Sequence, residues 1–224
     1  MRRCPLCSSD KTGPFYQDRK RTIHRCKVCM LLFADASSYL PPDAELSKYR
    51  AANNKHKPMQ QLISSLVTQV EQLNPNPLLG LNFGRLVNSS TIEALRQRGH
   101  HLLQYDPFFA ADHSLLKQQY DFISCYKVFE HFRLPSKEWQ LLCSILKPGG
   151  WIAINTQLIT ELNGFAKWHH KNNLTHVSFY QRATFQYLAQ HAGFRLLFAS
   201  NDLILVQKPP GSGITRDPSS LISS

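Results

Sequence analysis

The hydrophobic residues in the middle of the chain recur first at helical spacing and then at strand spacing. Between residues 57 and 73, apolar side chains return every three or four positions, which predicts an amphipathic helix. They are Met59, Leu62, Ile63, Leu66, Val70 and Leu73. Pro75 and Pro77 end this helix. The apolar run from Leu78 to Phe83 then predicts a buried strand that leads into a turn at Gly84.

Helix and strand patterns alternate through the rest of the chain. The predicted segments are a helix ending at Gly99, strands at 102–105 and 120–128, a helix from Pro135 to Leu146, a strand at 151–156, a helix at 181–192, and strands at 194–199 and 203–207. The last two strands meet across a hairpin turn at residues 200–202. This alternation predicts an α/β domain over residues 57–208.

The first 33 residues differ because they carry four paired cysteines. Cys4 and Cys7 form one C-x2-C knuckle, and Cys26 and Cys29 form a second one after 18 intervening residues. Two such knuckles supply the four thiolates of a closed tetrahedral zinc site, so residues 1–33 are predicted to be a small ribbon around a structural zinc. Disulfides or a redox C-x2-C pair are the alternative, which a reducing compartment disfavours.

Two segments flank the predicted domain. Residues 34–56 contain Ser-Ser, Pro-Pro and Asn-Asn pairs and are predicted to be a linker, in which Tyr49 packs on the main domain or lines its cleft. Residues 209–224 are rich in proline, glycine and serine, and they are predicted to be a disordered tail.

The chain is strongly basic, with a formal net charge of +11 over 224 residues. A basic surface favours polyanions, so a nucleic acid is one possible partner, and a solvated basic face without a partner is the alternative. The sequence has no apolar run of 18 residues, and its first residues are not apolar enough for a signal peptide. We therefore expect a cytoplasmic protein with no membrane partner.

Two residues of the α/β domain occupy positions typical of nucleotide ligands. Gly84 lies in the first strand–turn–helix unit, where a bound cofactor needs the backbone to come close. Asp106 ends the second strand, 22 positions after Gly84, as does the carboxylate that binds ribose hydroxyls in such domains. The alternative for an aspartate before Pro107 is a turn residue.

Several stretches resemble the class I S-adenosylmethionine-dependent methyltransferase superfamily. They are Tyr120–Ile123, Glu130–His131, Leu146–Gly150 and the closing hairpin. Tyr105–Phe109, Ala166–His169 and Thr175–Tyr180 are similar to stretches of small bacterial members with an N-terminal two-knuckle zinc module. The resemblance covers nearly all of residues 1–208. It implies a Rossmann-like sheet with a terminal antiparallel hairpin, S-adenosylmethionine as cofactor, and a methyl acceptor that the sequence does not identify.

The first, glycine-rich motif of that superfamily is degenerate in this chain. The superfamily pattern is acidic-x-Gly-x-Gly-x-Gly, whereas this chain has Asn82 at the acidic position and Leu86 and Asn88 at the second and third glycine positions. The branched Leu86 side chain stands where the methionine part of the cofactor passes, so the altered turn is expected to impair an active enzyme. The cofactor ligands that the resemblance implies are Asn82, Gly84, Asp106 and Tyr126.

Two functions are favoured over a third, a sequence-specific nucleic-acid reader, because no predicted helix carries a dense stripe of arginine and lysine. For a methyltransferase, the resemblance implies in-line attack on the sulfonium methyl, with His169 or His176 as base or substrate-orienting group. The alternative for both histidines is that they pin their loop by hydrogen bonds. The alternative function is a non-catalytic, methyltransferase-like binding protein whose basic zinc module contacts nucleic acid or protein. We favour the methyltransferase.

Overall fold

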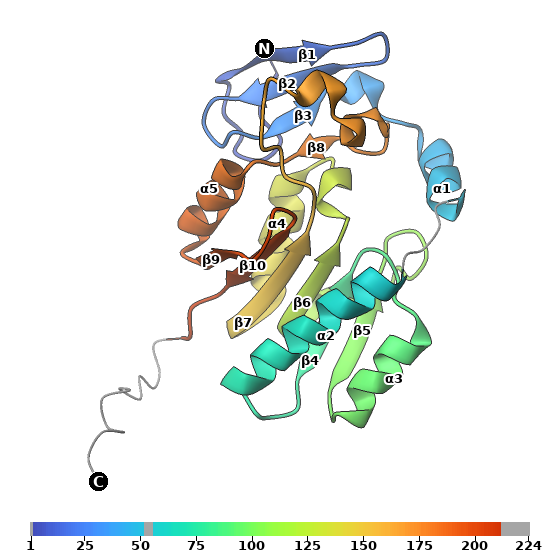
Figure 1. Cartoon of the computed structure of the whole chain (residues 1–224), viewed down its shortest axis with the longest axis vertical. Coiled ribbons are helices and arrows are strands. Elements are labelled where there is room, and N and C mark those ends of the chain that lie inside the picture. Colours follow the sequence, from blue (N-terminus) through green and yellow to red (C-terminus); the bar gives the residue numbers. More distant parts are fainter. Residues whose placement is uncertain (1, 52–55, 212–224) are drawn as a thin grey trace, which may run out of the picture.

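The computed structural model describes residues 2–51 and 56–211, and a six-stranded mixed sheet forms its centre (Figure 1). The strand order is β5-β4-β6-β7-β10-β9, and the first four of these are parallel. Strand β10 runs antiparallel to β7 and β9, which gives the expected terminal hairpin. The strands are β4 (Leu79–Phe83), β5 (His101–Tyr105), β6 (Tyr120–Tyr126), β7 (Leu146–Asn155), β9 (Arg195–Phe198) and β10 (Leu203–Gln207).

Helices cover both faces of this sheet. Helices α2 (His56–Leu73) and α3 (Ser89–Gln97) pack on one face, over a core that contains Ile63 and Phe122. Helices α4 (Pro135–Ile145) and α5 (Arg182–Ala192) pack on the other face, over Ile152 and Ile204. The apolar stripe of the helix predicted at 57–73 is the buried side of α2, except for Leu73 at its end, which is 66% exposed. The α/β prediction is therefore confirmed.

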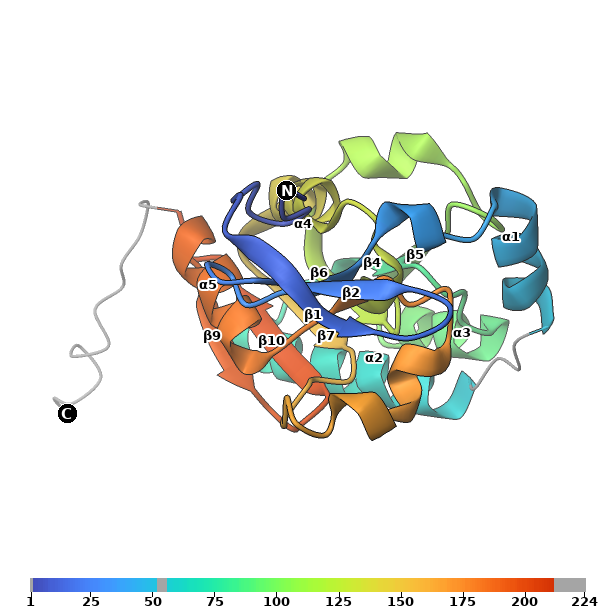
Figure 2. The ribbon, with the colours of Figure 1, turned by 90° about the horizontal axis from the view of Figure 1, so that it is seen from above.

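The first part of the chain forms a second, four-stranded antiparallel sheet. Its strands are β1 (Thr12–Gln17), β2 (Thr22–Cys26), β3 (Leu32–Ala34) and β8 (Ser178–Phe179). The fourth strand comes from the far end of the chain, where Phe179 pairs with Leu32 and Ser178 with Phe33. This sheet lies above the ends of the parallel strands in Figure 1 and crosses over them in Figure 2.

The two sheets share one hydrophobic core. Leu31, which precedes β3, and Phe33 of β3 belong to the same buried cluster as Trp139 of α4 and Phe185 of α5. The side-chain amide of Gln181, just before α5, donates to the carbonyl of Met30 (2.6 Å). Loss of the N-terminal sheet would therefore expose apolar surface of the main domain as well.

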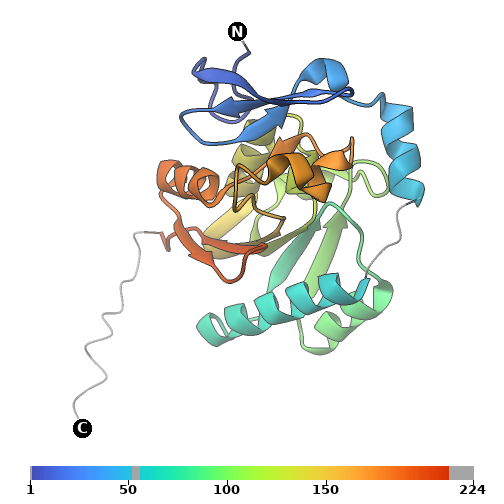
Figure 3. The same cartoon turned by 45° about the horizontal axis from the view of Figure 1, so that its top comes forward.

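The segment predicted as a linker contains regular structure. Residues Ala36–Ser38 form a 3-10 turn, and Pro42–Ala51 form helix α1, which runs down beside the main domain (Figure 3). Asn53 and Asn54 of this segment lie outside the described residues, as do residues 212–224 of the predicted tail. Within the described ranges, no helix combines the length and the apolar character that crossing a bilayer requires.

Candidate functional site

A cavity of about 700 Å³ opens at the carboxyl ends of the parallel strands. The residues that follow β4, β5 and β6 all line it: Gly84, Asp106 and Lys127. Helix α1 closes one side with Glu45 and Tyr49, and the wall continues through His131 and Arg133. Ligands of open α/β sheets bind at this edge, because loops there diverge and leave a crevice.

Gly84 has the conformation and the packing that only a glycine allows. Its φ is +104°, and a Cβ on this residue would lie 2.8 Å from Cγ2 of Val128. The turn after β4 therefore presses against the turn after β6. Leu86 also lines the cavity, so its branched side chain stands beside the space in which a cofactor would lie.

Asn82 braces this turn from the inside. Its side chain is fully buried; the amide Nδ2 donates to the carbonyl of Arg85 (2.6 Å), and Oδ1 accepts from the Ser124 hydroxyl (2.9 Å). An ionised aspartate has no donor for the Arg85 carbonyl, so the asparagine suits the turn that this chain makes. Among the described residues that line the cavity, Asn82 is not found.

Asp106 presents a carboxylate to the cavity. Its Oδ1 accepts from the backbone N–H groups of Phe108 (2.7 Å) and Phe109 (3.0 Å), as in an aspartate turn. Both interpretations of this residue are thus compatible with its geometry, because these bonds engage one of its two oxygens. Burial raises the pKa of the carboxyl group, against the opposing effect of the two N–H donors.

Three other predicted residues lie away from the described cavity wall. Tyr126 is buried in the core beneath α2, on the opposite face of the sheet from α4. His169 is exposed at the start of a 3-10 turn, His169–Asn172. His176 is half-buried and reaches the cavity only through His131, whose ring centroid is 4.9 Å from its own.

Helix α1 contributes a polar chain that the sequence interpretation did not foresee. The Tyr49 hydroxyl donates to Oε1 of Glu45 (2.7 Å), and Oε2 of Glu45 accepts from Arg133 (2.6 Å). The Tyr49 oxygen also lies 3.1 Å from Nδ1 of His131. Burial, and then the bond to Glu45, raise the pKa of the Tyr49 hydroxyl. Signals of this helix were present, since Pro42 begins it, Asp43 and Glu45 lie in its first turn, and Lys48 and Arg50 in its last.

Three histidines and one glutamate gather behind this wall. His176 lies against His170, with ring centroids 4.0 Å apart and the rings tilted by 38°, and it packs edge-on against His131. Burial lowers the pKa values of His131 and His170 to about 3 and that of His176 to about 4, so all three rings are neutral at physiological pH. Glu130 is 1% exposed, and burial raises the pKa of its carboxyl group.

The segment Thr175–Gln181 joins this cluster to the N-terminal sheet. The Thr175 carbonyl accepts from Nδ1 of His131 (3.0 Å), and the Val177 N–H donates to the Glu130 carbonyl (2.8 Å). On the other side, the Val177 carbonyl accepts from the Ala34 N–H (2.9 Å). The buried Arg21 donates to the carbonyls of His176 (2.7 Å) and Asn173 (3.3 Å), which clamps the loop that carries His176.

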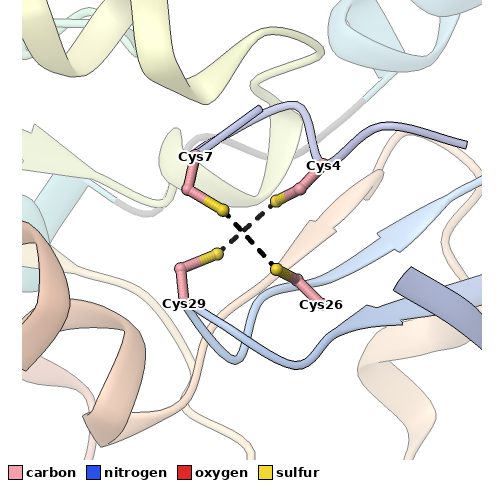
Figure 4. Close-up of side chains that lie close together, drawn as sticks. All are labelled: Cys4, Cys7, Cys26 and Cys29. Carbon is pink, nitrogen blue, oxygen red and sulfur yellow. Dashed lines mark hydrogen bonds between the residues drawn. The ribbon is translucent and has the colours of Figure 1, made fainter. Parts of the chain in front are cut away.

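The four paired cysteines form a second cluster, in the N-terminal sheet (Figure 4). The Sγ atoms of Cys4 and Cys29 are 3.5 Å apart, as are those of Cys7 and Cys26. A disulfide needs about 2 Å, whereas four sulfurs around a zinc ion are about 3.8 Å apart at a Zn–S distance of about 2.3 Å. The hydrogen bond with the Cys29 sulfur lowers the pKa of the Cys4 thiol to about 6. Ser8 and Met30, which follow the two knuckles, have left-handed φ values of 59° and 61°.

Most of the chain matches one protein family. A family described as a methyltransferase domain matches residues 35–198. The chain belongs to this methyltransferase domain family. The match begins directly after β3 and runs into β9, so it contains α1 and the residues that line the cavity.

Solved methyltransferases share the fold. The 1,6-didemethyltoxoflavin-N1-methyltransferase of Burkholderia thailandensis, with 1,6-didemethyltoxoflavin and S-adenosylhomocysteine bound, gives a TM-score of 0.50 at 12% identity, over 87% of this chain and 97% of that chain. An O-methyltransferase family protein from the same organism gives 0.47 at 14% identity, over 70% and 59% of the two chains. A SAM-dependent methyltransferase from Archaeoglobus fulgidus gives 0.42 at 16%, over 61% and 69%. None of the curated proteins matches this chain.

Proposed function

We propose that this chain transfers a methyl group from S-adenosylmethionine to a small molecule that binds in the 700 Å³ cavity. The observation that carries the proposal is the position of Asp106. Its carboxylate ends β5, faces the cavity, and lies beside the Gly84 turn, where a nucleoside ribose binds in domains of this architecture. The bound S-adenosylhomocysteine of the Burkholderia enzyme, which shares the fold, supports the same cofactor here.

In this proposal, the cofactor lies along the carboxyl ends of β4 and β5. Asp106 accepts from the ribose hydroxyls, and the Gly84 turn lets the backbone come close. Leu86 narrows the passage for the methionine part, which lowers affinity. Asn82 acts indirectly, by holding the turn through the Arg85 carbonyl.

The methyl acceptor lies on the side of the cavity formed by Tyr49, Phe108 and His131. Phe108 is 41% exposed and packs on Tyr49 with ring centroids 5.1 Å apart, so the acceptor meets an aromatic surface. Of the two histidines predicted for catalysis, His176 acts by positioning His131. His169 is exposed and lies outside the described cavity wall. It could therefore contact only an acceptor that is long enough to extend out of the cavity.

We also propose that Cys4, Cys7, Cys26 and Cys29 hold a structural zinc ion. The sulfur separations match a tetrahedral four-thiolate site, and the cluster is largely enclosed. A closed set of four thiolates leaves no position for substrate, so the ion stabilises the sheet that clamps the His176 loop.

The cofactor proposal is tested by calorimetric titration with S-adenosylhomocysteine. Asp106→Asn keeps the oxygen that accepts from Phe108 and Phe109 but removes the charge, and we expect at least about tenfold weaker binding, or about 1.4 kcal/mol. Asp112→Asn is the matched control, because Asp112 is exposed and caps a 3-10 turn. Absence of binding by the unaltered protein at millimolar ligand would point to a non-catalytic protein. Equal affinity of the Asp106 variant would place the ribose elsewhere.

A further inference from the structure

A second group of potential metal ligands lies next to the cavity, far from the cysteines in the sequence. One ligand atom from each of Glu130, His131 and His176 lies within 4.8 Å of the others. These residues come from two loops, at 129–131 and 173–176, which the Val177–Glu130 backbone bond holds together. Two imidazoles and one carboxylate are a common donor set of divalent transition metals in proteins.

The hydrogen bonds of the two histidines leave the same ring nitrogen for a ligand. Nδ1 of His131 lies 3.0 Å from the Thr175 carbonyl and Nδ1 of His176 lies 2.8 Å from the His170 carbonyl. A carbonyl oxygen only accepts, so each Nδ1 carries the proton and each Nε2 carries the lone pair. Metal-binding histidines are fixed in this way, by donation from the second ring nitrogen to a backbone carbonyl. Nε2 of His176 accepts from the exposed amide of Asn173 (3.0 Å), a donor that an ion would displace.

Glu130 has the support expected of a ligand but lacks a close cation. Its Oε2 accepts from the Thr156 hydroxyl (2.8 Å), which leaves Oε1 toward the histidines. The nearest recorded basic atom is Nε2 of His170, 3.8 Å from Oε1, too far for a hydrogen bond. Among the described residues, this buried Nε2 has no hydrogen-bond partner at all. A carboxylate and an imidazole nitrogen are thus enclosed together, and neither satisfies the other.

We propose that Glu130, His131 and His176 bind a divalent transition-metal ion, with His170 as a fourth nitrogen beside Glu130. Imidazole donors favour zinc, iron, cobalt or nickel over magnesium and calcium, which prefer oxygen. Because His131 is part of the cavity wall, the ion lies at the acceptor end of the cavity. It balances the charge of the buried Glu130, and a position open toward the cavity would take an oxygen or nitrogen atom of the acceptor. The metal site does not depend on the cofactor proposal, since its residues are separate from Gly84 and Asp106, whereas the role given to its open position rests on the proposed function.

The test is the number of zinc ions bound by the full chain. The reduced, metal-free protein is given one equivalent of zinc chloride to fill the four thiolates and is then titrated with more zinc chloride, by calorimetry and native mass spectrometry. We expect two equivalents for the unaltered protein and one for Glu130→Gln and His176→Ala. The glutamine side chain in the first of these variants keeps an acceptor for Thr156 and so preserves the local packing, which circular dichroism checks. His191→Ala is the matched control, because His191 is exposed on α5.

The outcomes separate clearly. Loss of the second equivalent in both cluster variants, with two equivalents kept by the His191 variant, establishes the site. One equivalent in the unaltered protein, or a second equivalent that binds equally well in all variants, overturns it. Binding of S-adenosylhomocysteine by the same samples reports on the cofactor proposal separately, so failure of one proposal is not read as failure of the other.

Discussion

The four-cysteine cluster and the cavity differ in how much of the chain each needs. The cysteines lie in two turns, and the short β1–β2 hairpin between these turns brings them together. Hydrogen bonds within residues 4–31, such as the one from the Cys26 N–H to the Leu31 carbonyl, define the turns. The cavity wall combines α1, the ends of three parallel strands and the loop after β6. The first site depends on local geometry, whereas the second depends on every contact that holds α1 and the two sheets in place.

The two regions are nevertheless coupled through one segment. Residues 175–181 pair with β3 on one side and hold Glu130 and His131 on the other. Arg21 adds a clamp from the N-terminal sheet to the His176 loop. The proposed zinc ion would thus support the side of the cavity that we assign to the acceptor without touching it, and the coupling can be broken from either end.

The largest effect is expected from removal of the proposed zinc ion. Structural zinc contributes about 10–16 kcal/mol to the folding of small four-ligand modules, so a strong chelator should unfold residues 2–34. Because β8 and the Arg21 clamp depend on this sheet, residues 173–181 should lose protection with it, while β4–β7 keep theirs. Hydrogen exchange with mass spectrometry measures both. Continued protection of residues 173–181 would show that their bonds to the Glu130 and Phe129 carbonyls hold this segment in place without the N-terminal sheet. Absence of zinc from the purified, reduced protein would contradict the proposed zinc site.

A smaller loss of stability is expected from Asn82→Asp, which alters the turn after β4 beside the cavity and leaves the cysteine cluster unchanged. The aspartate would be a fully buried carboxylate, it would lose the donor to the Arg85 carbonyl, and no cation is recorded beside it in the described residues. An uncompensated buried charge costs about 3–5 kcal/mol of unfolding free energy, which urea unfolding at neutral pH measures. Asn88→Asp is the matched control. Asn88 caps α3 through its side-chain oxygen, and aspartate caps equally well.

If Asn82→Asp instead left stability unchanged and tightened cofactor binding, the side chain would turn toward the cavity as in the superfamily pattern. That outcome would restore Asn82 as a direct ligand and refute its role as a brace.

The contrast between local and long-range contacts also explains which features could be predicted from the sequence. The cysteine spacing, the apolar runs of β4 to β7 and the position of Asp106 are local patterns. The structure brings the four cysteines together, forms the four parallel strands, with β7 beginning earlier than predicted, at Leu146, and has Asp106 directly after β5. The inward direction of Asn82 depends on Ser124 of a neighbouring strand, and the exposure of His131 to the cavity depends on α1 and Thr175. No local pattern contains those partners. Helix α1 was hidden by its polar composition, because a helix with little apolar surface gives a weak periodic signal.

The smallest of these effects tests the coupling directly, through Arg21→Met. Methionine retains much of the aliphatic packing but removes both donors to the His176 loop. The bond to the His176 carbonyl (2.7 Å) is the stronger of the two, because the bond to Asn173 is long (3.3 Å), and one hydrogen bond from a charged donor contributes about 1.5–3 kcal/mol. We expect unfolding free energy to fall by about 2 kcal/mol and amide exchange to quicken at residues 170–176, with the zinc content unchanged. Arg19→Met is the control, since Arg19 is exposed on the same hairpin. Faster exchange in the Arg21 variant with zinc still bound would locate the coupling in this clamp. Unchanged exchange would leave β8 as the link, because its backbone bonds to β3 do not involve any side chain that the substitution alters.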